Sequence, residues 1–241
     1  ESVTDTIKVT VSDGQGGSTI KDVEVTITGS NDVPVITSAS TAAEGAVTED
    51  ATQQTTATGT LTASDIDGDS LTFSVVSSTG TYGSLAIDGT SGVWTYTLNN
   101  SDPDTDSLSE GESVTDTIKV TVSDGQGGST IKDVEVTITG SNDVPVITSA
   151  STAAEGAVTE DATQQTTATG TLTASDVDDD SLTFSVAGTN GIYGTLAIDA
   201  ANAGAWTYIL NNSDTDTDSL SKDESVTDTI KVTVSDGQGG S

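Results

Sequence analysis

Closely spaced carboxylates are the residues of this sequence that could do chemistry. In the stretch ASDIDGDS (residues 63–70), Asp65, Asp67 and Asp69 occupy alternate positions, and ASDVDDDS (residues 174–181) repeats the arrangement. Carboxylates this close repel one another unless a cation lies between them. Calcium takes hard oxygen ligands, which Asp and Asn supply from loops. The spacing therefore predicts cation binding, and the next question is which kind of loop holds these side chains.

The EF-hand does not fit either stretch. That loop needs Gly at position six and Glu at position twelve, between two helices. Counting from Asp65, these positions hold Ser70 and Val76, and the second stretch fails in the same way. The flanking segments GTLTA and SLTFSV alternate apolar and polar residues and are rich in Thr, Val and Phe. Such flanks are typical of strands, so the carboxylates are expected in loops between strands.

The composition excludes several functional classes. The 241 residues include 38 acidic and 6 basic side chains, giving a net charge of −32, and His, Cys and Met are absent. A chain this acidic repels phosphates and anionic lipid, so we expect neither a nucleic-acid partner nor direct membrane insertion. Catalysis would have to rest on carboxylates, Ser and Lys alone. We therefore expect no enzyme.

The apolar residues indicate a two-sheet, all-β fold rather than disorder. In DTIKVTVSD, Ile118, Val120 and Val122 fall on one face, and in VWTYTL, Trp94 and Tyr96 share a face with the following leucine. Strict period two over short runs, separated by clusters of Gly, Asn, Asp and Ser, is typical of β-sandwiches. No stretch of the sequence is convincingly helical.

The sequence is a tandem repeat. Residues 1–65 recur unchanged as residues 112–176, and ESVTDTIKVTVSDGQGGS recurs a third time from Glu224. A unit of 111 residues with seven or so short strands has the size of an immunoglobulin-like Greek-key sandwich. With repeat starts placed near the prolines of VPVITSA, we expect the last two strands of a preceding repeat (1–31), a complete sandwich (32–142) and a second sandwich lacking its last strand (143–241).

The order of these motifs resembles VCBS-type and bacterial cadherin-like repeats, which occur in giant repeats-in-toxin (RTX) adhesins and biofilm matrix proteins. The segments that carry the resemblance are GTLTASDIDGDSLTFSV, YGSLAID, GVWTYTLNN, ESVTDTIKVTVSDGQGGS and VTITGSNDVP, and they cover essentially the whole chain. The resemblance implies cadherin-like sandwiches in a linear array, with Ca²⁺ bound at their junctions.

The resemblance also implies particular ligands. The sequence matches four features of such repeats: an early Glu, an Asp-x-Asp after an early strand, an Asp at the end of the penultimate strand and an Asn-Asp pair in the linker. For the first junction these are Asn31, Asp32, Asp65, Asp67 and Asp124; for the second they are Glu49, Asn142, Asp143, Asp176, Asp178 and Asp236, and Glu160 and Asp13 match at the outer ends. The acidic pair that such repeats carry in mid-domain has no counterpart, which predicts one or two ions per junction.

Other acidic and aromatic residues have more than one interpretation. The loop SDPDTDSLSEGE holds Asp102, Asp104 and Asp106, with a second copy at residues 214–218, and here we favour a solvated acidic loop over a metal site. Trp94 and Trp206 could stack on a sugar, but their alternation with Thr favours core packing. DGQGGS is interpreted as a hairpin turn, because no helix follows it.

These observations favour a non-catalytic, calcium-rigidified extender of a secreted bacterial cell-surface adhesin, which projects a binding domain and supports adhesion and biofilm formation. Its expected partners are neighbouring repeats of the same chain, and like chains in a filament or matrix. Two alternatives stay open. One is a subunit of an extracellular filament, assembled because Ser18 to Gly29 of one chain supplies the strand that another lacks. The other is a carbohydrate-binding sandwich.

Overall fold

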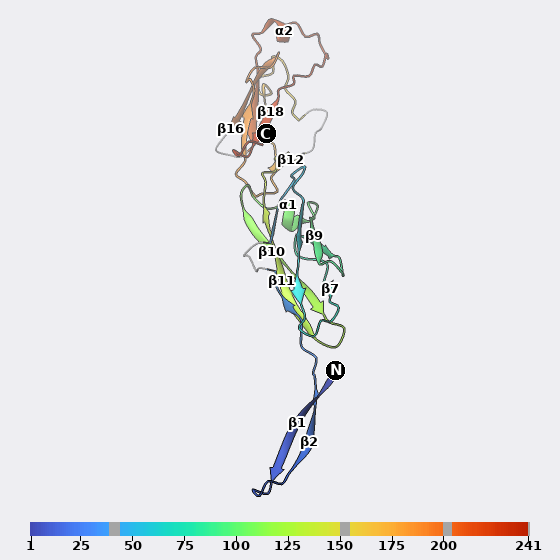
Figure 1. Cartoon of the computed structure of the whole chain (residues 1–241). Coiled ribbons are helices and arrows are strands. Elements are labelled where there is room, and N and C mark those ends of the chain that lie inside the picture. The colour runs from blue at the N-terminus through green and yellow to red at the C-terminus, as the bar shows by residue number, and fades with distance from the viewer. Residues whose placement is uncertain (39–43, 150–154, 200–203, 241) are drawn as a thin grey trace.

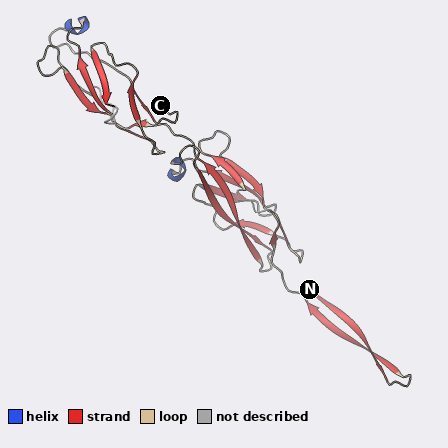
Figure 2. Cartoon of the chain, turned by 90° about the vertical axis from the view of Figure 1, so that its left-hand side faces the viewer, coloured by secondary structure: helices blue, strands red, loops and turns tan. Residues whose placement is uncertain are grey.

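The computed structural model describes residues 1–38, 44–149, 155–199 and 204–240, and these form an all-β chain. A hairpin, a central sandwich whose strands lie between residues 35 and 139, and a C-terminal sandwich whose strands lie between residues 146 and 235 follow one another along one elongated axis (Figures 1 and 2). No helix in the described ranges is long and apolar enough to cross a bilayer. The expected all-β fold of tandem sandwiches is confirmed.

The N-terminal hairpin stands apart from both sandwiches (Figure 1). Strands β1 (Ser2–Ser12) and β2 (Ser18–Thr28) pair antiparallel along their whole length, with Ser12 opposite Ser18 across the DGQGG turn. That turn confirms the interpretation of DGQGGS. Every residue of both strands is exposed, including the valines and isoleucines that alternate along them.

The central sandwich contains two main sheets and one short strand pair. One sheet has the order β4-β11-β10-β7, the other β5-β9-β8, and β3 pairs with β6. Neighbours such as β7 and β10 are far apart in sequence, as in a Greek key. The strands are β3 (Val35–Ile36), β4 (Gly45–Thr48), β5 (Thr56–Thr60), β6 (Ala63–Ser64), β7 (Thr72–Val75), β8 (Gly83–Ile87), β9 (Val93–Leu98), β10 (Ser113–Ser123) and β11 (Ser129–Thr139).

Period-two alternation builds the core of this sandwich. Trp94, with only 3% of its surface exposed, lies in the core with Tyr96, which confirms core packing over a sugar-binding face. Gly59, opposite Trp94 on β5, leaves room for the indole, because a side chain at this position would overlap the ring. The Tyr96 hydroxyl donates a 2.8 Å hydrogen bond to the buried Asp116 carboxylate, which also accepts from the backbone N–H of Thr81.

The C-terminal sandwich repeats this plan with shorter sheets. It contains the sheet β13-β17-β16 and the pairs β12-β14 and β15-β18. The strands are β12 (Val146–Ile147), β13 (Thr167–Thr171), β14 (Ala174–Ser175), β15 (Thr183–Val186), β16 (Gly194–Asp199), β17 (Ala205–Leu210) and β18 (Val232–Ser235). Trp206 packs in its core with Leu172 and Leu196, each slightly more exposed than its central counterpart.

Two single-turn helices correct the expectation that nothing is helical. Helix α1 (Pro103–Asp106) and helix α2 (Thr215–Asp218) precede β10 and the matching segment of the C-terminal sandwich. Asp102 caps α1 by accepting a hydrogen bond from the Asp104 N–H, and Pro103 has a backbone preset for the first turn. The turns are too short for a hydrophobic period to reveal them, but the Asp-Pro-Asp sequence contains the cap.

Candidate metal centres

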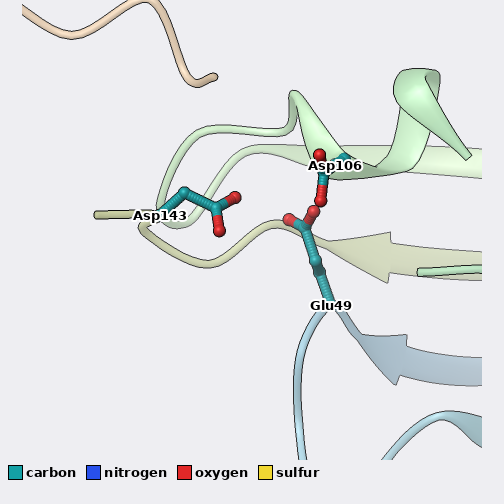
Figure 3. Close-up of side chains that lie close together, drawn as sticks. All are labelled: Glu49, Asp106 and Asp143. Atoms are coloured by element: carbon teal, nitrogen blue, oxygen red, sulfur yellow. The ribbon is translucent and has the colours of Figure 1, made fainter. Parts of the chain in front are cut away.

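Three carboxylates from separate segments converge where the central sandwich ends. Glu49 follows β4, Asp106 is the last residue of α1, and Asp143 lies in the linker that leaves β11. One ligand oxygen from each lies within 4.8 Å of the other two. Figure 3 shows the three side chains directed toward a common region from these segments. Glu49 is 1% exposed, and the Ser141 N–H donates a 3.1 Å hydrogen bond to its Oε2 atom.

A second acidic cluster faces the linker from the C-terminal sandwich. Asp176, Asp178 and Asp180 lie in the loop after β14, with one oxygen from each within 4.8 Å of the others. The Asp143 N–H donates a 2.7 Å hydrogen bond to Asp178 Oδ2. Ser109 Oγ of the central sandwich donates to the Asp178 carbonyl oxygen at 3.4 Å. The two clusters therefore meet at one junction, joined through Asp143 and Asp178.

The linker amide completes this junction. Asn142 Nδ2 donates hydrogen bonds to Asp236 Oδ2 at 3.1 Å and to the Asp143 carbonyl oxygen at 2.8 Å. Asp236 also accepts from the backbone N–H groups of Gln238 and Gly240, which fixes its carboxylate at the turn after β18. All six residues predicted for the second junction are thus brought together there. Their role as ligands stays a prediction.

Five oxygen atoms at this junction are buried without a hydrogen-bond donor. They are Glu49 Oε1, Asn142 Oδ1, Asp143 Oδ2, Asp176 Oδ2 and Asp178 Oδ1. Buried polar atoms normally have partners, because an unpaired one loses its hydration without compensation. The ion pairs found among the described residues lie elsewhere: Lys8 with Asp22, Lys119 with Asp133 and Lys132 with Glu44. The junction therefore gathers unpaired acceptors without a neutralising ammonium group.

The electrostatics of the two most buried acids reflect this crowding. Burial raises the pKa of Glu49 to about 7, with a further contribution from the Asp143 carboxylate and an opposing one from the Ser141 N–H. Burial raises the pKa of Asp143 to about 6, and the carboxylates of Asp178 and Asp106 add to the rise. These groups accept protons more readily than usual because both burial and like charge disfavour their ionised forms.

The aspartates at the strand-end turns behave in the opposite way. The hydrogen bond from the Asn31 side chain holds the pKa of Asp124 below its ordinary value, against the effect of burial. At Asp236 burial acts to raise the pKa, but the bonds from Asn142 and from the backbone of the turn outweigh it and lower the pKa. These carboxylates stay ionised and hold the linker amides in place.

The first junction repeats half of this arrangement. Asn31 Nδ2 donates to Asp124 Oδ2 at 2.9 Å, and the Asp32 N–H donates to Asp67 Oδ2 at 2.7 Å. The Asp67 N–H in turn donates to Asp65 Oδ1 at 2.9 Å. All five residues predicted for this junction are linked in pairs, yet Asn31, Asp32 and Asp67 are exposed.

The predicted ligand sets omitted three members of these clusters. Asp69 and Asp180 complete the two loop clusters, and Asp106 joins Glu49 and Asp143. The interpretation of residues 102–106 as a solvated acidic loop stays a prediction: Asp104 is exposed, whereas Asp106 is half-buried beside Glu49 and Asp143. Asp69 and Asp180 belong to the alternately spaced aspartates of the two loops, but the family resemblance matches only the Asp-x-Asp pair of each loop. Nothing in the sequence places α1 next to Glu49, because their approach depends on how β4 and β11 pack.

The donor set fits calcium. Calcium takes six to eight hard oxygen ligands from carboxylates, amide oxygens and backbone carbonyls, and the second junction presents carboxylates and one amide oxygen from both sandwiches. Zinc, copper and iron sites normally include His or Cys, which this sequence lacks. Gly128 keeps the Asp124 turn tight, since a side chain there would overlap the carboxylate.

The model of the bacterial cadherin-like domain family matches residues 31–140 and 142–241. The chain belongs to this family. No curated protein sequence matches it. Among solved structures, it is similar to mouse cadherin-23 EC22-24, with 19% identity, a TM-score of 0.49, and coverage of 86% of this chain and 63% of that one.

Two further cadherin structures show the same level of similarity. Mouse clustered PcdhgC3 EC1-3 is 20% identical with a TM-score of 0.42, and the match covers 87% of this chain and 67% of that chain. Drosophila N-cadherin EC1-4 is 16% identical with a TM-score of 0.37, and the match covers 99% of this chain and 56% of that chain. The chain thus spans less than two thirds of the cadherin-23 and N-cadherin chains.

Proposed function

We propose that this cadherin-like chain is a non-catalytic spacer of a secreted bacterial cell-surface adhesin of the RTX type, stiffened by calcium at its junctions. The spacer projects a binding domain from the cell and so supports adhesion and biofilm formation. The tandem sandwiches, their linear order and the family membership support an extracellular adhesion module. The observation that carries the calcium assignment is the set of five buried, unpaired oxygens at the second junction.

The proposed mechanism is a linkage between binding and rigidity. Glu49 and Asp106 belong to the central sandwich, Asp176 and Asp178 to the C-terminal one, and Asp143 lies between them. A cation held by residues from both sides favours one relative orientation, whereas the bare carboxylates repel. Sites in extracellular modules have dissociation constants on the order of 10⁻⁴ to 10⁻³ M. At about 100-fold excess over such a constant, one ion adds about 2.7 kcal/mol.

Asp178→Asn tests the proposal, with Asp179→Asn as its matched control. Asp178 is 7% exposed and bonds the linker, while its neighbour Asp179 is exposed and absent from the acidic clusters of the described residues. Asp179 has a positive φ of 60°, which Asn tolerates. We expect calcium, and not magnesium, to raise the melting temperature of the native chain and of Asp179→Asn, with a much weaker effect on Asp178→Asn.

Small-angle X-ray scattering supplies the second readout. The native chain should keep its largest dimension at millimolar calcium and give a broader distribution of distances in chelator. Asp178→Asn should resemble the chelated chain under both conditions. A melting temperature and a scattering profile indifferent to calcium would overturn the calcium assignment and leave the cadherin-like spacer without its proposed stiffening.

A further inference from the structure

The carboxylate of Asp106 reaches the second junction from a helix that cannot hold itself in place. Helix α1 is a single turn of four residues. A turn this short is not stable alone, because its first hydrogen bond does not offset the cost of ordering the backbone. Yet one Asp106 oxygen lies within 4.8 Å of oxygens of Glu49 and Asp143 (Figure 3). Contacts outside α1 must therefore set the position of this carboxylate.

The first of these contacts is made by Thr105, the completely buried residue of α1. Its Oγ1 atom donates a 3.4 Å hydrogen bond to the Tyr82 carbonyl oxygen, which also accepts from the Asn99 N–H at 3.0 Å. The Tyr82 N–H donates at 3.2 Å to Asp116, the core carboxylate that binds the Tyr96 hydroxyl. A continuous series of hydrogen bonds thus ties α1 to the core of the central sandwich.

The same contact occurs in the C-terminal sandwich. Thr217 of α2 is completely buried, and its Oγ1 atom donates to the Tyr193 carbonyl oxygen at 3.4 Å. The Tyr193 N–H donates at 3.1 Å to Asp228, which accepts from the Tyr208 hydroxyl at 2.8 Å. The loop that carries the accepting carbonyl reads STGTYGS in the central sandwich and TNGIYGT in the C-terminal one. The contact therefore does not depend on the other side chains of that loop.

The second contact is a close approach between Gly140 and the residues that follow α1. A side chain at position 140 would overlap the backbone carbonyl oxygens of Leu108 and Ser109. The Gly140 N–H donates to the Glu112 carbonyl oxygen at 2.9 Å, and the Gly140 carbonyl oxygen accepts from the Gly111 N–H at 3.2 Å. Leu108 itself is buried in the core. The segment after α1 is thus held between the core and the start of the linker.

This backbone contact lies between the two sides of the junction. Gly140 directly precedes Ser141, whose N–H donates to Glu49 Oε2 at 3.1 Å. Glu49 is 1% exposed, and its other oxygen, Oε1, is buried without a hydrogen-bond donor. Ser109 Oγ donates to the Asp178 carbonyl oxygen at 3.4 Å. The approach at Gly140 therefore sets the distance between a segment that binds Glu49 and one that binds the C-terminal sandwich.

We propose that Thr105 and Gly140 are positioning residues of the second junction. They hold α1 so that Asp106 faces Glu49 and Asp143 before a cation is bound. The inference rests on the proposed calcium function and deepens it, because a site whose ligands are already in place binds more tightly than one whose ligands must first be ordered. Both residues act through Asp106 rather than on the ion.

Calcium titration tests this role at the second junction. All variants carry Asp67→Asn, which removes a candidate ligand of the first junction. Gly140→Ala should weaken calcium binding in calorimetry by about 10- to 100-fold, as when groups that orient metal ligands are removed. Thr105→Val, which loses the hydroxyl but keeps the volume, should also weaken binding, and Thr105→Ser should restore most of the affinity. Gly188→Ala is the matched control, because nothing lies within 4 Å of a side chain added there.

Melting temperatures in chelator separate positioning from stability. A residue that only stabilises the fold would lower the melting temperature and leave the calcium affinity of the folded chain unchanged. That result for both Gly140→Ala and Thr105→Val would refute the positioning role and leave the calcium assignment standing. A parent Asp67→Asn chain that binds no calcium would overturn both.

Hydrogen exchange tests the preset position of α1 without any metal. The N–H groups of Thr105 and Asp106 donate to the Asp102 carbonyl oxygen at 3.0 and 2.9 Å. In the native chain these amides should exchange slowly in chelator, and calcium should slow them little further. In Thr105→Val they should exchange faster in chelator, and calcium should slow them strongly. If the native amides exchanged in chelator as fast as those of an unfolded chain, α1 would form only with the ion and the proposal would fail.

Discussion

The two sandwiches are nearly identical in sequence, yet their cores differ in completeness. Val47 and Leu85 of the central sandwich are 1% exposed, whereas Leu196, the counterpart of Leu85, is 9% exposed and Val158, the counterpart of Val47, is half-buried. The difference traces to β11, which the central sandwich has and the described part of the C-terminal one lacks. One strand thus determines whether its two neighbours are strands and how well the core is sealed.

The largest expected effect comes from adding a counterpart of β11 to the C-terminal sandwich. Appending TIKDVEVTIT after Ser241 should stabilise the C-terminal sandwich by several kcal/mol, because three more apolar side chains become buried. Each sandwich holds one tryptophan, Trp94 or Trp206, so Trp94→Phe and Trp206→Phe variants report on each unfolding transition separately. Hydrogen exchange at residues 225–231 should slow in the appended chain. Unchanged exchange there would show that β11 is not what orders this segment.

A smaller effect should separate Glu49 from its counterpart Glu160. Because the folded-state pKa of Glu49, about 7, lies above the ordinary 4.5, protonation favours the folded state. In chelator this contribution, up to about 3 kcal/mol, is fully present below pH 4.5 and is lost as the pH rises through 7. Glu49→Gln should remove that slope, as read by denaturant unfolding of the Trp206→Phe chain. Glu160→Gln should leave the pH dependence of this stability unchanged. If the two variants had equal slopes, the assignment to Glu49 would be refuted.

The ion pair between β4 and β11 gives the next comparison. Glu44 and Lys132 are mostly buried, with side-chain exposures of 10% and 11%. Glu44→Gln should cost the central sandwich about 1–3 kcal/mol, because it leaves a buried ammonium without its charged partner. Glu155→Gln should change the C-terminal sandwich by less than about 0.5 kcal/mol. The unfolding of each sandwich is followed by its own tryptophan. If Glu44→Gln and Glu155→Gln lowered the stability of their sandwiches equally, the ion pair of Glu44 would not explain the loss.

The smallest expected effect concerns an exposed pair. Lys119 and Asp133 lie 2.7 Å apart on the outer face of β10 and β11, with side chains 57% and 45% exposed. Exposed ion pairs contribute little because water screens them, so Lys119→Ala should cost less than about 1 kcal/mol. Lys231→Ala, at the matching position just before β18, should cost still less. Measuring the unfolding midpoint at increasing salt distinguishes the loss of the ion pair, which salt screens, from a loss of strand propensity, which it does not.

The same eleven residues show what sequence can and cannot predict. SVTDTIKVTVS forms an eleven-residue strand in β1 and β10 but only a four-residue strand, β18, at residues 225–235. Period-two alternation predicted the strands, the hairpin turn and the burial of Trp94 and Trp206, because these depend on local pattern. The extent of a strand depends on its partners, which no local pattern contains.

The residues of the candidate metal centres show the same distinction between local pattern and tertiary packing. The Asp-x-Asp loops and the Asn-Asp linkers are local motifs, and the sequence indicated all of the residues later found at each junction except those that tertiary packing adds. Asp106 belongs to a helical turn set by its cap, and it reaches Glu49 only because β4 pairs with β11. A contact that depends on a parallel strand pair 91 residues apart leaves no signature in one sequence.

The parallel pairing of β4 with β11 has a mechanical consequence. β4 lies near the start of the central sandwich and β11 at its end, and their hydrogen bonds include Glu44 N–H to the Glu135 carbonyl and Glu49 N–H to the Thr139 carbonyl. A tension that draws the two ends of this sandwich apart pulls the two strands past each other in opposite directions. The hydrogen bonds between them are then loaded in shear and must break together rather than one after another. The strand that seals the core is therefore also the one that resists stretching.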